Sequence, residues 1–175
     1  MIALQITSMK NFMTQLLAAD TFDIFLLEEA VITVGNTISI DGHFNSAFYT
    51  APTAAGAELT AEDASLCPYE FTPWKQVKGM CFNLIKGKHT PLSFKFVFQL
   101  NPEQMKRLLV KEECSVDPSL IKALVLTIRF DGTKTLLTTG TSYTTFVLSK
   151  EPDQIWDKVL QKYLAGKGIS FEAVS

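Results

Sequence analysis

Few side chains in this sequence are spaced so that they could carry out chemistry, and the clearest pair is a histidine close to an aspartate. His43 lies two residues after Asp41, at the end of a predicted strand. An imidazole next to a carboxylate can act as a base or as a ligand if further side chains converge on it. An exposed histidine in a hairpin explains the same two residues without chemistry. Asp41 and His43 are therefore the candidate pocket of a small-molecule-binding protein or an enzyme.

Basic side chains provide a second candidate, a surface for an anionic partner. Arg107 and Lys111 lie on the outer face of one predicted helix, and Lys158 and Lys162 lie on successive turns of another. Lysine and arginine bind phosphate groups without reading a base sequence. Lysines near the end of a helix also simply complement its dipole. The same two interpretations, an anionic partner or a solvated helix face, apply to a further group beside Trp74: Lys75, Lys78, Lys86 and Lys88.

Motifs that resemble phosphate-binding or hydrolase signatures lack a required residue. A Walker loop at Gly87-Lys88 would need glycine five residues before Gly87 and serine or threonine after Lys88. Those positions hold Phe82 and His89. Ser142 is not in a GxSxG turn. Neither sequence supports catalysis.

Cysteine and glutamate spacing gives no metal site and no acid/base pair. Cys67, Cys81 and Cys114 are widely separated and odd in number, which is typical of reduced thiols. The adjacent glutamates at 28–29 and 112–113 are expected to be solvated. We therefore expect no metal and no cofactor, and the sequence favours a non-enzymatic protein.

Composition indicates a chain that folds by itself. It has 175 residues, 47% of them hydrophobic, and a net charge of −2. No dominant basic stripe of the kind that strong nucleic-acid binders carry is visible. No apolar run approaches the roughly eighteen residues that a membrane helix needs, and no signal peptide is visible. We expect a cytoplasmic protein with no membrane partner.

Hydrophobic periodicity predicts alternating strands and helices. Asn101 followed by Pro102 predicts the start of a helix, and Asp131-Gly132 predicts a hairpin. Gly79 weakens the helical pattern around it, and Gly140 suggests another reversal. The predicted strands are 2–6, 22–34, 37–44, 92–100, 121–130, 134–139, 143–148 and a short 169–171, and the predicted helices are 9–17, 74–85, 102–111 and 151–165.

The predicted elements recur in the same order in two parts of the chain. Residues 2–44 and 92–148 both run strand, helix, strand, strand, and both helices contain the pattern MxxLL. We predict one α+β domain over 1–175, with half-repeats at about 1–50 and 91–149 and an insertion at 51–90. The C-terminal helix at 151–165 follows them. The sheet should be mainly antiparallel, with the helices on one face.

The second half resembles one half-repeat of a sliding-clamp domain, the unit that builds DNA polymerase processivity factors. The resemblance is carried by FKFVFQLNPEQMKRLL, LVLTIRFDG and LLTTGTSY, over about a third of the chain. It implies a clamp-like fold whose helices face the nucleic acid, which would place Arg107 and Lys111 against DNA phosphates. One such domain cannot encircle a duplex, so it would assemble into an oligomer or act from one face.

The segment TFDIFLLEEAVITVGNTISIDGH resembles a small bacterial family without an assigned activity. This resemblance implies no functional residue. We therefore expect a non-enzymatic, clamp-like scaffold or interaction module, with protein or duplex DNA as its partner. Non-specific DNA association would use Arg107, Lys111, Lys158 and Lys162. The alternative is a small-molecule-binding protein or enzyme with a pocket near Asp41 and His43, or in the 51–90 insertion.

Overall fold

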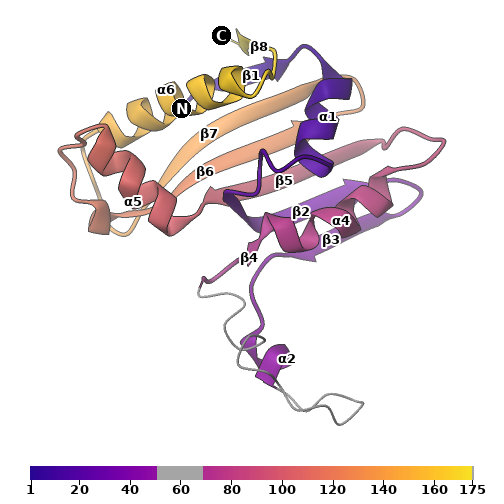
Figure 1. The fold of residues 1–175 in the computed structure, drawn as a ribbon, viewed down its shortest axis with the longest axis horizontal. Coiled ribbons are helices and arrows are strands. Elements are labelled where there is room, and N and C mark those ends of the chain that lie inside the picture. The colour runs from indigo at the N-terminus through magenta and orange to yellow at the C-terminus, as the bar shows by residue number, and fades with distance from the viewer. Residues whose placement is uncertain (51–68, 175) are drawn as a thin grey trace.

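The protein is built on one antiparallel β-sheet, seen here in a computed structural model that describes residues 1–50 and 69–174. Among these residues the sheet has eight strands: seven follow the order β3-β2-β5-β6-β7-β1-β8, and the eighth, the short β4, pairs with β2. Figure 1 shows the sheet behind the helices. The strands are β1 (Ala3–Ile6), β2 (Phe25–Thr33), β3 (Thr37–Asp41), β4 (Thr72–Pro73), β5 (Ser93–Leu100), β6 (Ile121–Phe130), β7 (Thr135–Tyr143) and β8 (Phe171–Val174).

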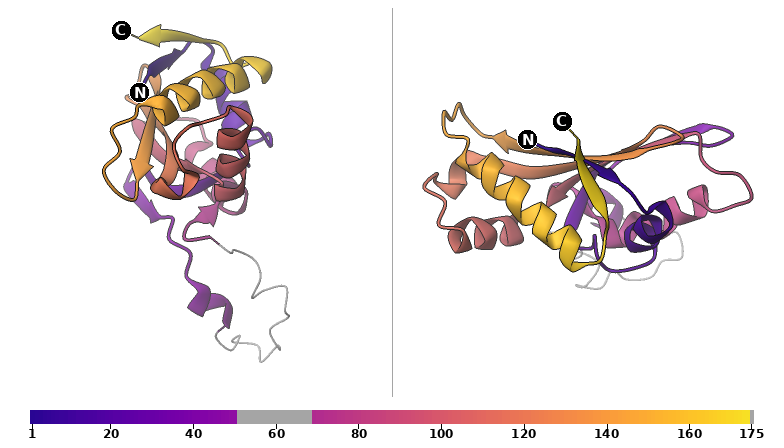
Figure 2. Two further views of the ribbon diagram at one scale, coloured as in Figure 1. Left: turned by 90° about the vertical axis from the view of Figure 1, so that its left-hand side faces the viewer. Right: turned by 90° about the horizontal axis from the view of Figure 1, so that it is seen from above.

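Four helices lie on the same face of this sheet, as the view from above in Figure 2 shows. They are α1 (Met9–Leu17), α4 (Trp74–Ile85), α5 (Pro102–Lys111) and α6 (Glu151–Gly166). A further helix, the short α2 (Ser46–Thr50), lies away from the sheet (Figure 1). The predicted α+β class, with an antiparallel sheet and helices on one face, is confirmed.

Burial that alternates along β5, and along most of β6, makes these strands two-faced. Phe94, Phe96 and Phe98 are buried while the residues between them are partly exposed. A period of two places alternate side chains on opposite sides of a sheet. In the register between β5 and β6, Phe96 lies beside Ile128. Burial therefore fixes both the register and the face that the helices cover.

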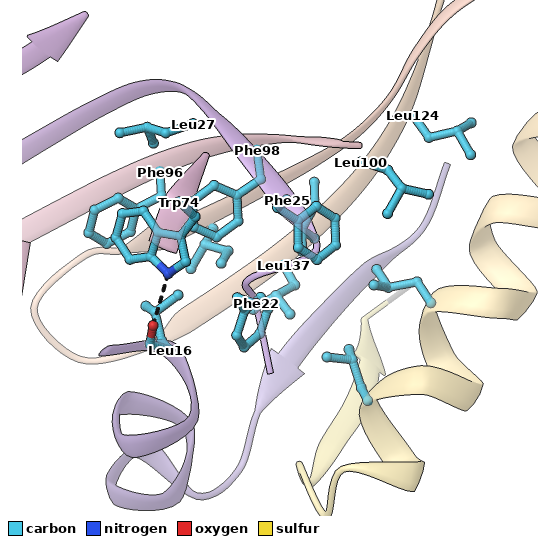
Figure 3. Close-up of a cluster of buried hydrophobic side chains, with 14 of the residues drawn as sticks. Leu16, Phe22, Phe25, Leu27, Trp74, Phe96, Phe98, Leu100, Leu124 and Leu137 are labelled. Carbon is cyan, nitrogen blue, oxygen red and sulfur yellow. Dashed lines mark hydrogen bonds between the residues drawn. The ribbon is translucent and has the colours of Figure 1, made fainter. Parts of the chain in front are cut away.

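Aromatic rings fill the space between the sheet and the helices (Figure 3). Trp74 of α4 lies with its ring centroid 4.9 Å from that of Phe98, and Phe98 stacks on Phe25 at 5.6 Å. Phe22 and Phe12 meet edge to face at 5.9 Å. Such pairs add about 0.5–1.5 kcal/mol each beyond the burial of their area. The five rings thus join both halves of the chain in one core.

The opposite face of the sheet carries no helix in the described part of the chain (Figure 2). Its side chains are mostly partly exposed, as for Val97, Thr127 and Thr138. Lys95 forms an ion pair with Glu29 across β5 and β2 at 3.3 Å. An antiparallel sheet tolerates one solvated face when that face mixes polar and apolar side chains.

Most predicted elements are confirmed, and the clearest error concerns β7. We predicted a reversal at Gly140 and a separate strand over 143–148. Instead Gly140 lies opposite Val125 within β7, which continues to Tyr143, and no strand follows before α6. Glycine is compatible with a turn and also with an extended strand. Pairing with the long neighbouring strand β6 therefore decided the conformation of Gly140, against the turn that we predicted. The helix around Gly79 does form, as α4.

The two predicted half-repeats share their element order but not their pairing. In the second, β5, β6 and β7 are neighbours in the sheet. In the first, β1 is separated from β2 by β5, β6 and β7, and it pairs with β7 and β8 instead. Both α1 and α5 lie on the same face (Figure 2). The duplication is therefore not confirmed, and the clamp resemblance stays a prediction.

Candidate binding surface between helices α5 and α6

Helix α5 is positioned by its cap and its buried stripe. Asn101 accepts a hydrogen bond from the main-chain N–H of Glu103 through its side chain, at 2.9 Å, and Pro102 occupies the first turn. This arrangement satisfies one of the otherwise unpaired N–H groups at the helix start. Met105 and Leu109 are buried against the sheet. The outer face, which carries Arg107 and Lys111, is therefore left exposed.

Helix α6 is held by two side chains that reach main-chain carbonyl groups. Trp156 donates its indole N–H to the carbonyl oxygen of Val125 in β6 at 2.9 Å. Tyr163 donates its hydroxyl to the carbonyl oxygen of Thr21 at 2.6 Å. Burial raises the pKa of Tyr163, and the carboxylates of Asp20 and Asp23 raise it further. The tyrosine therefore stays neutral and keeps its hydrogen bond.

A groove of about 350 Å³ lies between these two helices. Its floor is apolar and comes from β5, the segment that leads into β2, and both helices. One edge carries the cationic groups of Arg107 and Lys111. The lining residues are Ile24, Phe25, Leu100, Gln104, Arg107, Leu108, Lys111, Glu112, Trp156, Val159, Leu160 and Tyr163.

Glu112 lies among three of the basic residues that the sequence singled out. Its carboxylate accepts a hydrogen bond from Lys158 Nζ at 3.1 Å. That bond lowers the pKa of Glu112, and the charges of Lys158, Lys162 and Lys111 lower it further. Arg107 lines the same groove as Lys111 and Glu112. Three of the four predicted basic residues thus act on Glu112 and the fourth lines the same groove, so this carboxylate offsets part of their positive charge.

Two features of this surface were not predicted from the sequence. Glu112 was interpreted as a solvated end of a helix, because nothing local indicates that α6 places Lys158 beside it. The apolar floor was missed because its residues come from separate elements. The sequence did offer one signal, because the apolar Val159 lies beside Lys158 and Lys162 on α6. In the structure Val159 is half-buried and lines the groove.

Asp41 and His43 do lie together, but at the surface. The imidazole Nδ1 is 2.6 Å from Asp41 Oδ1, and the other ring nitrogen is 3.7 Å from Glu70 Oε1. The hydrogen bond to Asp41 raises the pKa of His43. The ring also contacts Phe71, with centroids 4.6 Å apart. A hollow of about 300 Å³ beside them is lined by Glu28, Glu29, Ser39, Ile40, Asp41 and His43.

This group ties together the two strands through which the chain leaves and rejoins the sheet. His43 forms a bridge with Phe71, and Gly42 accepts a main-chain hydrogen bond from Thr72 at 2.8 Å. Both ionisable partners are more than half exposed, so water surrounds the pair. The arrangement suits a structural role better than a catalytic one. We call this group of Asp41, His43, Glu70 and Phe71 the clasp, because it holds the two chain segments together. The remaining part of the predicted alternative pocket, 51–68, lies outside the described residues.

The second basic group is partly neutralised. Lys78 forms an ion pair with Asp23 at 2.8 Å and donates to the carbonyl oxygen of Ala19. Lys86 lies over the ring of Phe82. A groove of about 370 Å³ between α1, α4 and the loop 86–91 contains Lys86, Lys88 and His89. Trp74 is fully buried, so it cannot stack on a nucleic-acid base.

No group of histidine, cysteine and acidic side chains suited to hold a metal ion occurs among the described residues. Cys81 is buried and Cys114 partly buried, and both are free thiols. Burial raises the pKa of Cys81 to about 11. Cys67 lies outside the described residues. Within residues 1–50 and 69–174, no helix is long and apolar enough to span a bilayer.

Fold and surface together define an α+β protein with a one-sided antiparallel sheet and a cationic groove on its helix face. The chain belongs to a family of unknown function, DUF5721, which matches residues 15–172. No curated protein and no solved structure matches it.

Proposed function

We propose that this protein is a non-enzymatic interaction module that binds an anionic partner through the surface formed by α5 and α6. The observation that carries the proposal is the convergence of Lys111, Lys158 and Lys162 around Glu112, with Arg107 lining the adjoining groove. A surface with several cations from two rigid helices attracts anionic groups without needing a deep polar pocket. Duplex DNA is the first partner to test.

The arrangement of the helices supports this proposal. In the described part of the chain, α1, α4, α5 and α6 lie on one face of the sheet (Figure 2). The two that carry the cations, α5 and α6, pack on β6 and β7. Helices on one face are also what the clamp resemblance implies. Phosphate contacts from such a surface would position DNA without specifying its sequence. Within residues 1–50 and 69–174, β3 and β8 have no strand on their outer side, so further copies could add at these edges to form an oligomer.

Exposed apolar side chains support a protein that works by binding a partner. Phe146 and Leu148, in the segment between β7 and α6, are each 85% exposed. Contiguous exposed apolar side chains are typical of contact surfaces. They add a protein partner to the proposal alongside DNA. We further propose that this work is done in the cytoplasm, in keeping with the free thiols Cys81 and Cys114.

Salt-dependent DNA binding tests the proposal. Fluorescence anisotropy of a labelled duplex would be measured at several salt concentrations. Four phosphate contacts give a slope of log K against log salt of about −3.6. The double variant Arg107→Ala with Lys111→Ala should weaken binding and make the slope shallower by about two.

A matched control removes the same two residue types from the other face of the sheet. Arg129 and Lys95 lie opposite each other on β6 and β5, on the face without helices. Arg129→Ala with Lys95→Ala makes the same change in net charge as Arg107→Ala with Lys111→Ala. Because it does so away from the proposed surface, DNA affinity should fall much less. Equal losses in both double variants would show that net charge alone is responsible. No binding at low salt would exclude DNA as the partner.

A further inference from the structure

We propose that the groove between α5 and α6 is a binding site for a small amphipathic carboxylate, a ligand with an apolar chain or ring and one acidic group. The inference goes beyond binding of an anionic surface, because it uses the apolar floor of the groove, which phosphates would leave unused. Its basis is the placement of an apolar hollow directly beside two cationic side chains.

The floor supplies a site for the apolar part of the ligand. Leu108 and Val159 are partly exposed and supply apolar contact surface in the groove. Phe25, Trp156 and Leu160 also line the groove but are almost fully buried, so they support this surface. The volume of about 350 Å³ is at the lower end of the roughly 300–1,000 Å³ found for ligand pockets. It therefore suits a short chain or a single ring better than a large cofactor.

The rim supplies the partner for the acidic group. Arg107 and Lys111 lie one turn apart on α5 and line the same edge of the groove. No ion pair joins either of them to a carboxylate among residues 1–50 and 69–174. The adjacent Glu112 is already paired with Lys158. A guanidinium group binds a carboxylate with two parallel hydrogen bonds, so Arg107 favours this anion.

Charge complementarity selects the carboxylate over other ligands of the same size. An alkyl ammonium ion would meet the positive charges of Arg107 and Lys111, and an uncharged alcohol would leave them without an anion. The comparable groove beside α1 and α4 is a weaker candidate. It is lined by more polar groups from the loop 86–91, and Lys86 already lies over Phe82.

Titration of the purified full chain with sodium decanoate, below its micelle concentration, tests the site. Isothermal titration calorimetry measures affinity, and tryptophan fluorescence reports on the groove. A change in emission would come from Trp156, because Trp156 lines the groove and Trp74 does not. We expect saturable one-to-one binding with a change in tryptophan emission. Decan-1-ol and decylamine should bind at least tenfold more weakly.

Filling the groove provides the decisive variant. Val159→Trp places a large side chain in it, and binding of decanoate should be lost. The control Val110→Trp puts the same side chain on an exposed position of α5 outside the groove, where Val110 is 72% exposed, and binding should be unchanged. If Val159→Trp does not fold, as judged by circular dichroism, Gln104→Trp fills the groove from an exposed position instead.

Failure of this inference can be told apart from failure of DNA binding. Val159→Trp keeps all four cations, so it should abolish decanoate binding while leaving any DNA affinity within twofold. Arg107→Ala with Lys111→Ala should weaken decanoate at least tenfold. The inference is overturned if decanoate gives no saturable signal, if decylamine binds as tightly, or if Val159→Trp and Val110→Trp behave alike.

Discussion

Trp74 donates its indole N–H to the carbonyl oxygen of Leu16 at 3.0 Å, although 58 residues separate them in the chain (Figure 3). The bond joins the start of α4 to the last turn of α1. Both residues are fully buried. The acceptor is one of the terminal carbonyl groups that a helix cannot satisfy internally. A single side chain therefore satisfies the end of α1 and anchors α4 in the aromatic core.

Replacing Trp74 by phenylalanine should destabilise the protein by about 1–3 kcal/mol, because the carbonyl of Leu16 would stay buried without its donor. Urea unfolding followed by circular dichroism measures the change. Phe146→Leu, on the 85% exposed Phe146, serves as a control and should stay within about 0.5 kcal/mol of the parent. A Trp74→Phe cost as small as that of the control would mean that the bond contributes nothing.

Two glycines should respond in opposite directions to the same substitution. At Gly42 an added Cβ would lie 1.7 Å from the main-chain oxygen of Leu27, whereas at Gly79 it would meet nothing within 4 Å. Gly42→Ala forces the backbone apart and should cost about 1–3 kcal/mol or more. Gly79→Ala, inside α4, should stabilise by up to about 1 kcal/mol through its helix propensity. Thermal unfolding of both variants checks this, and a destabilising Gly79→Ala would contradict the continuous helix that α4 forms through Gly79.

The Cys81 thiol should be chemically silent in the folded protein. Its pKa is raised to about 11 by burial, so almost no thiolate, the reactive form, is present at pH 8. We expect the native parent and Cys81→Ala to show the same number of thiols that react with a disulfide reagent. In denaturant the parent should show one more. A native-state difference of one thiol between them would show that Cys81 is accessible.

Stability should depend on the protonation of His43. The hydrogen bond to Asp41, and the charges of Asp41, Glu70 and Glu28, raise the pKa of His43 above 6.5 in the folded state. The protonated ring is therefore favoured by folding. This contribution is complete below the unfolded pKa and is lost as pH rises through the folded pKa.

Urea unfolding of His43→Asn at pH 6 and pH 9 isolates that contribution. The parent should lose stability between these pH values, and the variant should lose less. His89→Asn is the matched control because no acidic partner of His89 is seen in the described part of the chain. An identical pH dependence in the parent and His43→Asn would show that the clasp near β3 is not formed in solution.

Local sequence patterns predicted this fold well where the structure of an element depends on residues within that element. The alternation of Phe94, Phe96 and Phe98 predicted β5, and Asn101 with Pro102 predicted the start of α5. Asp131 accepts main-chain hydrogen bonds from Thr133 and Lys134, as the predicted turn requires. Each of these signals depends only on residues a few positions apart.

Long-range pairing explains what local patterns could not predict. The position of β1 rests on the pairing of Leu4 with Leu137, across most of the chain, and no turn or period specifies it. The same holds for the candidate surface. Arg107 and Lys158 could each be proposed from helix faces, but the groove between α5 and α6 depends on how these helices pack against the sheet. Glu112 became significant only because that packing brings Lys158 to it.

Glu112→Gln tests whether the α5–α6 surface acts through its charge. The carboxylate lies among Lys158, Lys162 and Lys111, and it is paired with Lys158. Removing it should tighten the binding of duplex DNA by about two- to fivefold at low salt, because Lys158 is released and the local potential becomes more positive. Glu113→Gln removes the same charge one residue further along and should change the affinity less.

The same variant should alter stability in the opposite sense to binding. The lowered pKa of Glu112 means that its ion pair stabilises the fold above the unfolded pKa of about 4.5 and that this contribution is lost as pH falls. Glu112→Gln should therefore be less stable than the parent at pH 7, and the difference should shrink towards pH 3. Lower stability with tighter DNA binding would show that Glu112 stabilises the fold and at the same time weakens anion binding. Lower stability with unchanged DNA binding would leave it a structural ion pair and would count against the proposed surface.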